Sequence, residues 1–198
     1  MKIIYGTGNK EKIKQMQKII NINNFDVQLL NLKDINFTDE IVEDGKNFEE
    51  NSRIKANAIR SFCNENGYED YIIITDDAGL CVDCLNGAPG ILSARYAGDH
   101  APQEIVLNKL LGNMKQFEKI EERTAEFACV LTASLPNGKY FVSRGEIHGK
   151  IALKAGKLGG LTYEPVFIPD GFDKPMSEMS IEEFARVKNH RDLAMLDI

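Results

Sequence analysis

The feature that most constrains the fold is a continuous apolar run, Tyr71-Ile72-Ile73-Ile74, which leads into Thr75-Asp76-Asp77-Ala78-Gly79. A strand that is covered on one face alternates apolar and polar residues, whereas an uninterrupted apolar run fits a central strand covered on both faces. The run therefore predicts a central strand over residues 71–75. An irregular stretch containing Gly and Pro is expected to follow, from 76 to 100.

Strand and helix patterns alternate through the first part of the chain, which predicts a mixed α/β sheet flanked by helices. An antiparallel extension is expected because Pro136-Asn137-Gly138 joins two long apolar runs, and Asn-Gly in that position favours a hairpin. No repeat, low-complexity tract or long linker divides the 198 residues, so one domain over 1–198 is expected. The predicted strands are 2–6, 26–30, 71–75, 124–135, 139–149 and 163–168, and the predicted helices are 9–21, 47–65, 102–111 and 180–196.

Charge and hydropathy narrow the possible functions. The formal net charge is −6, whereas a protein that binds nucleic-acid polymers non-specifically needs a basic surface. No apolar run approaches the roughly 18 residues needed to cross a bilayer, and the first residues lack the apolar stretch of a signal peptide. Four scattered cysteines do not resemble a disulfide framework. We expect a soluble, cytoplasmic protein whose partners include neither a membrane nor a nucleic-acid polymer.

The first predicted helix carries polar residues on its apolar side. Asn9 and Lys12 fall on that side in its first turn, directly after Thr7-Gly8. Because a helix N-terminus presents unbonded N–H groups and partial positive charge, these four residues together fit an anion-binding loop. The alternative is that Asn9 only caps the helix while Lys12 extends to solvent.

The second predicted helix repeats this pattern, with Asn51 and Lys55 on its apolar side. A lysine on a buried face is costly unless it is paired or faces a wet cleft. Two lysines that enter apolar faces near helix starts suggest a single anionic ligand bound by both.

Two adjacent carboxylates, Asp76 and Asp77, follow the predicted central strand, at the sheet edge where α/β proteins bind ligands. Such a pair suits a divalent metal and the activation of water. Adjacent strand residues point to opposite sides, so one of the two is expected to be the direct ligand. The alternative is that Asp76 is a cap or turn residue. Glu43, just before the second helix, could supply a further carboxylate.

These motifs resemble those of the inosine triphosphate pyrophosphatase family, enzymes that remove non-standard purine nucleotides such as ITP, dITP and XTP. The resemblance covers nearly the whole chain. Its segments are Thr7-Gly8-Asn9-Lys10-Glu11-Lys12, Glu43-Asp44-Gly45, Phe48-Glu49-Glu50-Asn51-Ser52, Lys55-Ala56, Asp76-Asp77-Ala78-Gly79-Leu80, Leu85-Asn86-Gly87-Ala88-Pro89-Gly90, Ser93-Ala94-Arg95-Tyr96, Phe167-Ile168-Pro169-Asp170-Gly171 and Asn189-His190-Arg191.

The resemblance implies a reaction and a site. The reaction splits a nucleoside triphosphate into nucleoside monophosphate and pyrophosphate, and the fold is an elongated mixed sheet with two lobes and a central cleft, commonly in a homodimer. Asp77 would bind Mg²⁺ and activate water, with Glu43 as a second metal ligand. The implied phosphate-binding residues are Thr7, Gly8, Asn9, Lys10, Glu11, Lys12 and Lys55; the other implied substrate-binding residues are Ala78, Leu161, Thr162, Tyr163, Glu164, His190 and Arg191, of which His190 and Arg191 would reach the base.

The chain departs from the family pattern mainly where that family reads the base. Its loop Gly159-Gly160-Leu161-Thr162-Tyr163-Glu164-Pro165 stands where Gly-Gly-Phe-Gly-Tyr-Asp-Pro is usual. The aromatic residue expected to stack on the base is thus a leucine. Ala78 replaces a serine and Ala185 replaces a lysine. We therefore predict that the chemistry is retained while base selectivity is altered or relaxed.

Two other classes of function follow from different features. The altered base loop would also suit a nucleotide sensor that binds without turnover. Cys81 and Cys84 have the spacing of a redox or zinc motif, but a second ligand pair and the usual strand-to-helix turn are missing, so a structural role is favoured.

Overall fold

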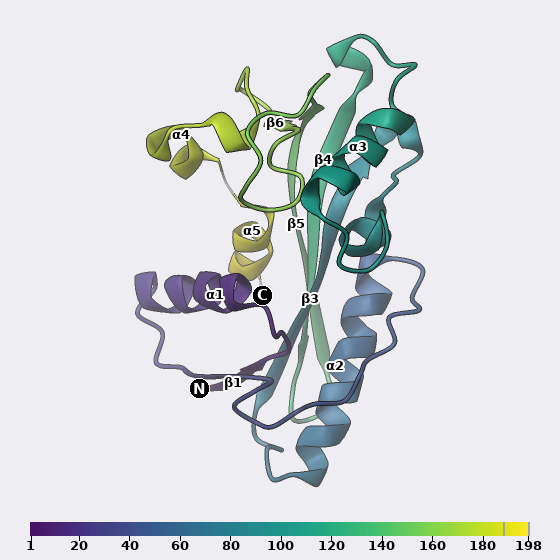
Figure 1. Cartoon of the computed structure of the whole chain (residues 1–198). Coiled ribbons are helices and arrows are strands. Elements are labelled where there is room, and N and C mark those ends of the chain that lie inside the picture. Colours follow the sequence, from purple (N-terminus) through teal and green to yellow (C-terminus); the bar gives the residue numbers. More distant parts are fainter. Residues whose placement is uncertain (188, 198) are drawn as a thin grey trace. The chain divides into compact units, whose positions relative to one another are not determined.

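A computed structural model describes residues 1–187 and 189–197 of the chain, in which a six-stranded sheet has the order β2-β1-β3-β4-β5-β6 (Figure 1). Strand β1 pairs in parallel with β2 and with β3, whereas β5 and β6 are antiparallel, which confirms the predicted mixed α/β class. The strands are β1 (Lys2–Tyr5), β2 (Gln28–Asn31), β3 (Ile72–Val82), β4 (Thr124–Ser134), β5 (Tyr140–Ile151) and β6 (Phe167–Pro169). The α-helices are α1 (Lys10–Ile22), α2 (Phe48–Glu65), α3 (Gln103–Asn113), α4 (Ile181–Arg186) and α5 (His190–Leu196).

Three boundaries differ from the predictions. Strand β3 does not end at residue 75 but continues to Val82, so the two aspartates lie inside a strand. The predicted helix 180–196 is interrupted between α4 and α5, where Val187 is extended; Lys188, within the predicted helix, lies outside the described residues. The predicted strand 163–168 begins at Phe167, because residues 163–166 form turns instead.

The chain forms two compact units, each built from separate segments. Unit 1 contains residues 1–77, 129–145 and those from Arg191 onward; unit 2 contains 78–128 and 146–190. Strands β3, β4 and β5 each contribute residues to both units. The expectation of one domain over the whole chain stays a prediction.

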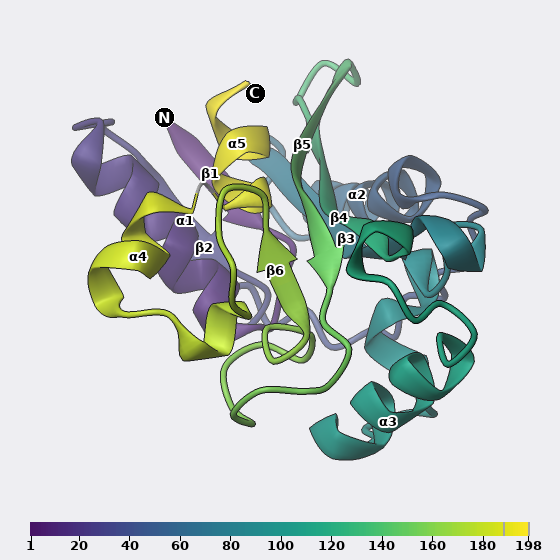
Figure 2. The same ribbon diagram turned by 90° about the horizontal axis from the view of Figure 1, so that it is seen from above.

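In unit 1, helices cover both faces of the sheet. Ile4 and Ile73 pack with Ile59 and Cys63 of α2 on one face. On the other face lie α1 and α5, where the Arg191 guanidinium donates to the side chain of Gln15. Figures 1 and 2 show α1 and α2 on opposite sides of β1 and β3. Successive residues of β3 therefore point into two different environments.

Unit 2 is stabilised by a buried arginine and an aromatic cluster. The Arg123 guanidinium donates to the carbonyl oxygens of Phe117, Ile151 and Ala152 at 2.9–3.1 Å, which satisfies a cation that is only 3% exposed. The Phe127 and Phe167 rings lie 4.6 Å apart between centroids. A buried cation with its donors satisfied in this way fixes the loops that it touches.

Two further observations bear on the predicted class of protein. Across residues 1–187 and 189–197, no helix is both long and apolar enough to cross a membrane. The four cysteines, all among the described residues, form no disulfide, and burial raises the pKa of Cys84 and raises that of Cys129 to about 12. Thiols with raised pKa values are poor nucleophiles and metal ligands, which agrees with a structural role for Cys84.

Candidate active site

The two adjacent aspartates of β3 point to opposite faces of the sheet, as the alternation of strand residues predicts. Asp76 faces α1 and α5, where its Oδ1 accepts a hydrogen bond from the Tyr5 hydroxyl at 2.9 Å. Its Oδ2 lies 2.6 Å from Lys12 Nζ and 3.3 Å from the Arg191 guanidinium. Asp76 is 2% exposed, and both of its oxygens already accept hydrogen bonds. Its position therefore fits a structural anchor for two cations.

The electrostatic surroundings of Asp76 are not those of a catalytic base. Burial alone would raise the pKa of Asp76, but Lys12 and Arg191 outweigh it and hold the pKa well below its usual range. Burial raises the pKa of the Tyr5 hydroxyl, and the charge of Asp76 raises this pKa further. The hydroxyl therefore stays protonated and remains a donor. A carboxylate with a strongly lowered pKa is a poor proton acceptor at neutral pH. Asp76 is therefore unsuited to activating water.

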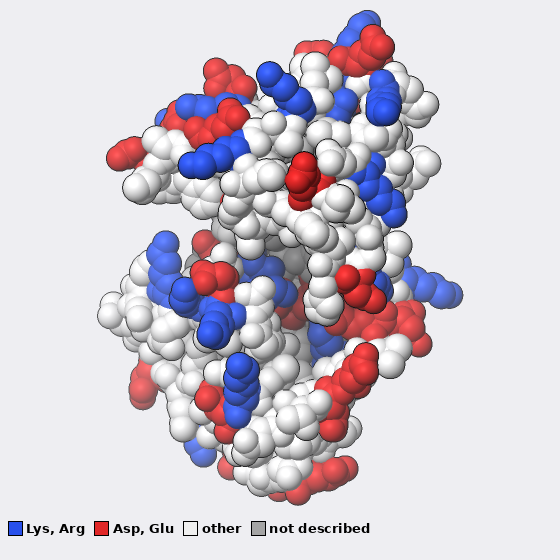
Figure 3. Space-filling view, viewed as in Figure 1, with Lys and Arg blue, Asp and Glu red and all other residues white. Residues whose placement is uncertain are grey.

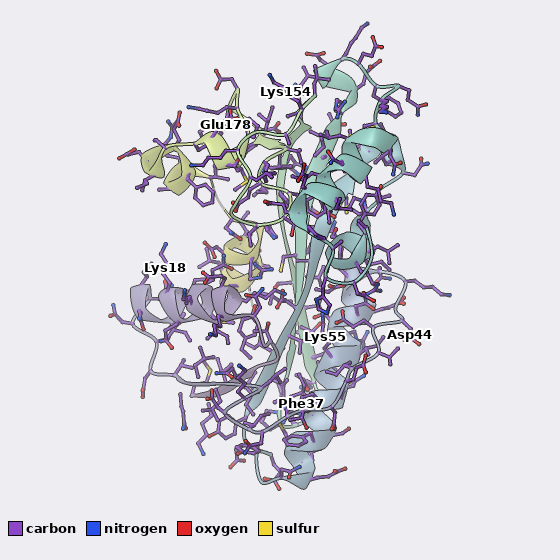
Figure 4. The ribbon with its side chains drawn as sticks, in the orientation of Figure 1. Lys18, Phe37, Asp44, Lys55, Lys154 and Glu178 are labelled. Carbon is purple, nitrogen blue, oxygen red and sulfur yellow. The ribbon has the colours of Figure 1, made fainter. Side chains whose placement is uncertain are left out.

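Asp77 faces α2, where the side chains of Asn51 and Lys55 contact it. Asn51 donates from Nδ2 to Asp77 Oδ2 at 3.0 Å, and its own Oδ1 accepts the Gly45 N–H at 2.9 Å. Lys55 Nζ lies 3.7 Å from Asp77 Oδ1 and 2.9 Å from Glu43 Oε2. The two predicted metal ligands are thus brought to the same lysine, whose position on α2 Figure 4 shows.

The residues of α2 reach this point because of how the helix packs on β3. The Thr75 hydroxyl donates to the backbone carbonyl of Ser52 at 2.7 Å, with both residues fully buried. Asn51 and Lys55 are four positions apart, so they lie on one side of α2. The packed Ser52–Thr75 contact thereby sets where the amide and the ammonium group stand beside Asp77.

The N-terminal loop combines the two alternatives that the sequence left open. Asn9 caps α1, since its Oδ1 accepts from the N–H groups of Glu11 and Lys12 at 2.9 and 3.4 Å. Lys12, however, does not extend to solvent but reaches Asp76. Thr7 is buried, and its hydroxyl accepts the Asn9 N–H. Glu11 is exposed and pairs with Lys14 at 2.8 Å, while Lys10 is exposed.

The loop and the two lysines line one pocket of unit 1, with a volume of about 300 Å³. Its wall includes backbone of the N-terminal loop, two ammonium groups and carboxylates on both sides of the sheet. The residues that matter here are Thr7, Gly8, Lys12, Glu43, Lys55 and Asp76. A pocket with cations and carboxylates side by side suits an anion that carries its own divalent cation.

The predicted base residues of unit 2 surround a much smaller pocket of about 40 Å³. Leu161 is 43% exposed at its rim, while Glu164 is 9% exposed and burial raises the pKa of its carboxyl group. The His190 ring stacks on Phe127 at 5.3 Å with an interplanar angle of 15°. These three predicted residues are therefore brought together.

Other predicted substrate residues lie apart from this pocket. Tyr163 is 4% exposed and its hydroxyl donates to the Ser93 carbonyl at 2.8 Å, so it supports the loop from below. Thr162 is exposed, and Ala78 is half-buried within β3. Arg191 belongs to unit 1, beside Asp76, and its predicted contact with a base stays a prediction.

Sequence reasoning missed several residues that position the site. The sequence singled out Asn51 as a polar residue on an apolar helix face. That its side chain connects Gly45 to Asp77 by two hydrogen bonds is visible only in the tertiary structure. Tyr5 carried no signal, because a tyrosine in a strand is ordinary. Phe127 also carried none, since its ring partner His190 is distant in the chain.

Charged side chains of both signs also lie outside the candidate site. Acidic and basic side chains are mixed over the face seen in Figure 3. A separate group in unit 2 brings His148 within 3.7 Å of Glu126 and of Glu146. His148 is exposed, and none of the three belongs to the predicted metal pair.

Known proteins resemble this chain over nearly its whole length. Residues 3–198 match the model of the Ham1 family. The dITP/XTP pyrophosphatase of Clostridium perfringens (strain 13 / Type A) is 38% identical over 194 residues, covering 98% of this chain and 93% of that protein. The protein of the same name from Bacillus subtilis (strain 168) is 36% identical over 189 residues, covering 96% and 91%.

Solved structures give the same result. The structure of the Staphylococcus aureus Ham1 protein superposes with a TM-score of 0.83 at 31% identity, covering 99% of this chain and 95% of that one. A HAM1 protein from Coxiella burnetii superposes with a TM-score of 0.84 at 27% identity, covering 100% and 95%.

Proposed function

Because this chain belongs to the Ham1 family, we propose that it hydrolyses nucleoside triphosphates, non-standard purine nucleotides among them, to nucleoside monophosphate and pyrophosphate. The curated relatives named dITP/XTP pyrophosphatases support this reaction, and the family match confirms the resemblance identified in the sequence. We also propose a cytoplasmic location, where such an enzyme would clean the nucleotide pool, and a homodimer; both come from the family resemblance.

The observation that carries the proposal is the different surroundings of Asp76 and Asp77. Asp76 is held by Tyr5, Lys12 and Arg191, and its pKa is well below the usual range. Asp77 instead meets Asn51 and Lys55 on the other face of β3. One carboxylate thus organises cations for the phosphates, which leaves the other for the reacting water.

The donor set fits Mg²⁺, which binds through one or two carboxylates together with substrate phosphates. Glu43 and Asp77 would hold the ion, since both approach the same Lys55 Nζ. When bound, it would supply Lewis-acid stabilisation of the charge on the phosphate oxygens. We propose magnesium dependence on this chemistry.

The chain's own residues perform the remaining steps of the proposed mechanism. Lys55 neutralises two carboxylates in the structure, and a substrate that arrives with its own cation would take over that task and leave Lys55 for the phosphates. Lys12, held by Asp76, supplies a second positive charge. Asp77, oriented by the Asn51 amide, accepts a proton from the attacking water. The water oxygen bonds to the α-phosphorus as the α–β anhydride bond breaks, and pyrophosphate leaves with its charge stabilised by the two lysines.

We further propose that base selectivity is altered or relaxed relative to the family. The position expected to stack on the base is Leu161, a residue without a π-face. Loss of one base-stacking contact costs about 1–3 kcal/mol, which corresponds to about 5- to 150-fold in affinity. Such a change is enough to shift a preference and too small to abolish turnover.

The test is pyrophosphate release with magnesium from ITP, XTP, dITP, the four standard nucleoside triphosphates and their deoxy forms. We expect turnover that is lost in Asp77→Asn and strongly reduced in Glu43→Gln, while both variants keep the wild-type circular dichroism spectrum. Near-normal turnover by Asp77→Asn would show that the base is misassigned. A preference for ITP and XTP over all standard nucleotides by a wide margin would contradict the relaxed selectivity.

If the wild-type protein binds these nucleotides but releases pyrophosphate from none of them, the sensor function applies instead. Size-exclusion chromatography with light scattering tests the homodimer, and a mass of 22.2 kDa would contradict it.

A further inference from the structure

We propose that Gln103 is a positioning residue for base recognition, because its carboxamide fixes the backbone of residues 159–162. The inference depends on the proposed function only in assigning this loop to the base. Gln103 is the first residue of α3 and drew no attention in the sequence. Figure 1 shows α3 beside the loop that precedes β6, within unit 2.

One side chain makes four backbone contacts with the loop. Gln103 Oε1 accepts the Gly159 N–H at 2.9 Å. Its Nε2 lies 3.1 Å from the Gly159 carbonyl oxygen, 3.1 Å from that of Leu161 and 3.2 Å from that of Thr162. The two N–H bonds of the amide are thus shared among three acceptors. The orientation of the amide follows from its partners, since carbonyl groups need a donor and the Gly159 N–H needs an acceptor.

The loop needs such a support because little else determines its conformation. Residues 157–162 are all exposed and form no regular secondary structure. Gly159 and Gly160 have φ values of +133° and +65°, a backbone conformation that glycine adopts far more readily than other residues. Two consecutive glycines lose more backbone entropy on ordering than other residues do. The four contacts of Gln103 offset that loss.

The conformation held by Gln103 determines the wall of the small pocket in unit 2. The Leu161 carbonyl accepts from both Gln103 Nε2 and the Glu164 backbone N–H, which lies 3.1 Å away. A side chain at Gly160 would collide with the Glu164 carboxylate, so the loop backbone lies directly on that group. Gln103 therefore sets the positions of Leu161 and Glu164, although it does not line the pocket itself.

The size of the pocket explains how this affects recognition. Its volume of about 40 Å³ is far below the roughly 300 Å³ at which ligand pockets begin. A purine ring can enter only if a lining residue moves, and movement of the loop backbone at Leu161 would break contacts with Gln103. That cost is common to all bases, so discrimination comes from the positions in which Gln103 holds Leu161 and Glu164, whose contacts differ from one base to another. Gln103 thereby adds to the discrimination between bases.

The test uses the full-length protein with Gln103→Ala, and Glu104→Ala as the matched control, since Glu104 is the exposed neighbour on α3. The rate of hydrogen exchange, measured by mass spectrometry, should rise about 5- to 30-fold in peptides covering 157–162. That factor is expected when the stabilisation of one or two net hydrogen bonds is lost. The control should match the wild type. Exchange that stays within twofold of wild type would overturn the proposed support of the loop.

Recognition is measured separately as the ratio of dissociation constants for ITP and ATP, by calorimetry with magnesium in the Asp77→Asn background. We expect the ratio to change by about 5- to 30-fold in Gln103→Ala, and Gln103→Glu, which keeps only the acceptor, to behave in the same way. In the turnover-competent background, KM should change more than kcat. An unchanged ratio, or a wild-type protein that binds neither nucleotide, would overturn the inference. Binding without turnover would instead contradict only the proposed catalysis.

Discussion

The clearest single perturbation is Asp76→Asn, which should reduce stability far more than the same change at the neighbouring aspartate. The asparagine keeps the shape of the side chain and an acceptor oxygen for the Tyr5 hydroxyl. It removes the negative charge that faces Lys12 at 2.6 Å and Arg191 at 3.3 Å. Two cations then face each other across a neutral amide.

The magnitude follows from the burial of the partners. Removing one member of a buried ion pair costs about 3–5 kcal/mol, because the other charge is left uncompensated. The Lys12 side chain is 24% exposed and can turn toward water, whereas the Arg191 side chain is 7% exposed and cannot. We therefore expect the lower end, about 3 kcal/mol. For a chain of this size that corresponds to a fall in Tm of about 6–12 °C.

The same charge predicts a pH dependence. The folded pKa of Asp76 lies well below its usual range because Lys12 and Arg191 outweigh burial. The stability that it contributes is therefore fully present above the unfolded pKa of about 3.9 and is lost as the pH falls below that value. The difference in unfolding free energy between wild type and Asp76→Asn should be constant near neutral pH and shrink below about pH 4.

The assay is urea unfolding at pH 7 and at pH 3.5, followed by circular dichroism, with Asp77→Asn as the matched control. Asp77 is less buried than Asp76, and Lys55 still pairs with Glu43 when the charge of Asp77 is removed. The Asp77→Asn variant should therefore lose about 1 kcal/mol or less of unfolding free energy. A loss below 1 kcal/mol in Asp76→Asn, or an equal loss in both variants, would refute the separate roles of the two carboxylates.

Three further changes test other parts of the structure. Asn51→Ala should lower kcat by about 10- to 100-fold, as for loss of a group that orients a ligand, because it releases Asp77; unchanged kcat would show that the hydrogen bond is dispensable. It should also cost about 1–3 kcal/mol in urea unfolding, because Asn51 is buried and the Gly45 N–H loses its acceptor. Gly6→Ala should lower Tm, since its methyl group would lie within 2.7 Å of α2 and β3 side chains; an unchanged Tm would mean that these side chains can move aside. Tyr163→Phe should cost about 1–2 kcal/mol in urea unfolding because the buried Ser93 carbonyl loses its donor, and a neutral result would show that another donor replaces it.

Much of the fold was predictable from local patterns. The elements from β1 to α2 and the hairpin strands β4 and β5 agree with the predicted ranges to within two residues. Apolar periodicity and turn chemistry depend on near neighbours in the chain, and they are readable without tertiary structure. The length of β3 was not readable in this way, because two charged residues in succession look like the end of a buried strand.

The site shows the same division. The sequence by itself determined that polar residues lie on the buried sides of two helices, and that Asp76 and Asp77 point to opposite faces of one strand. Only the tertiary structure decided which cations meet which carboxylate, and that Gln103 supports a loop more than fifty residues away. Arg191 reaches Asp76 across 115 positions of the chain. The physical reason is that a buried charge must find a partner wherever packing places one, and periodicity along the chain carries no information about partners that distant.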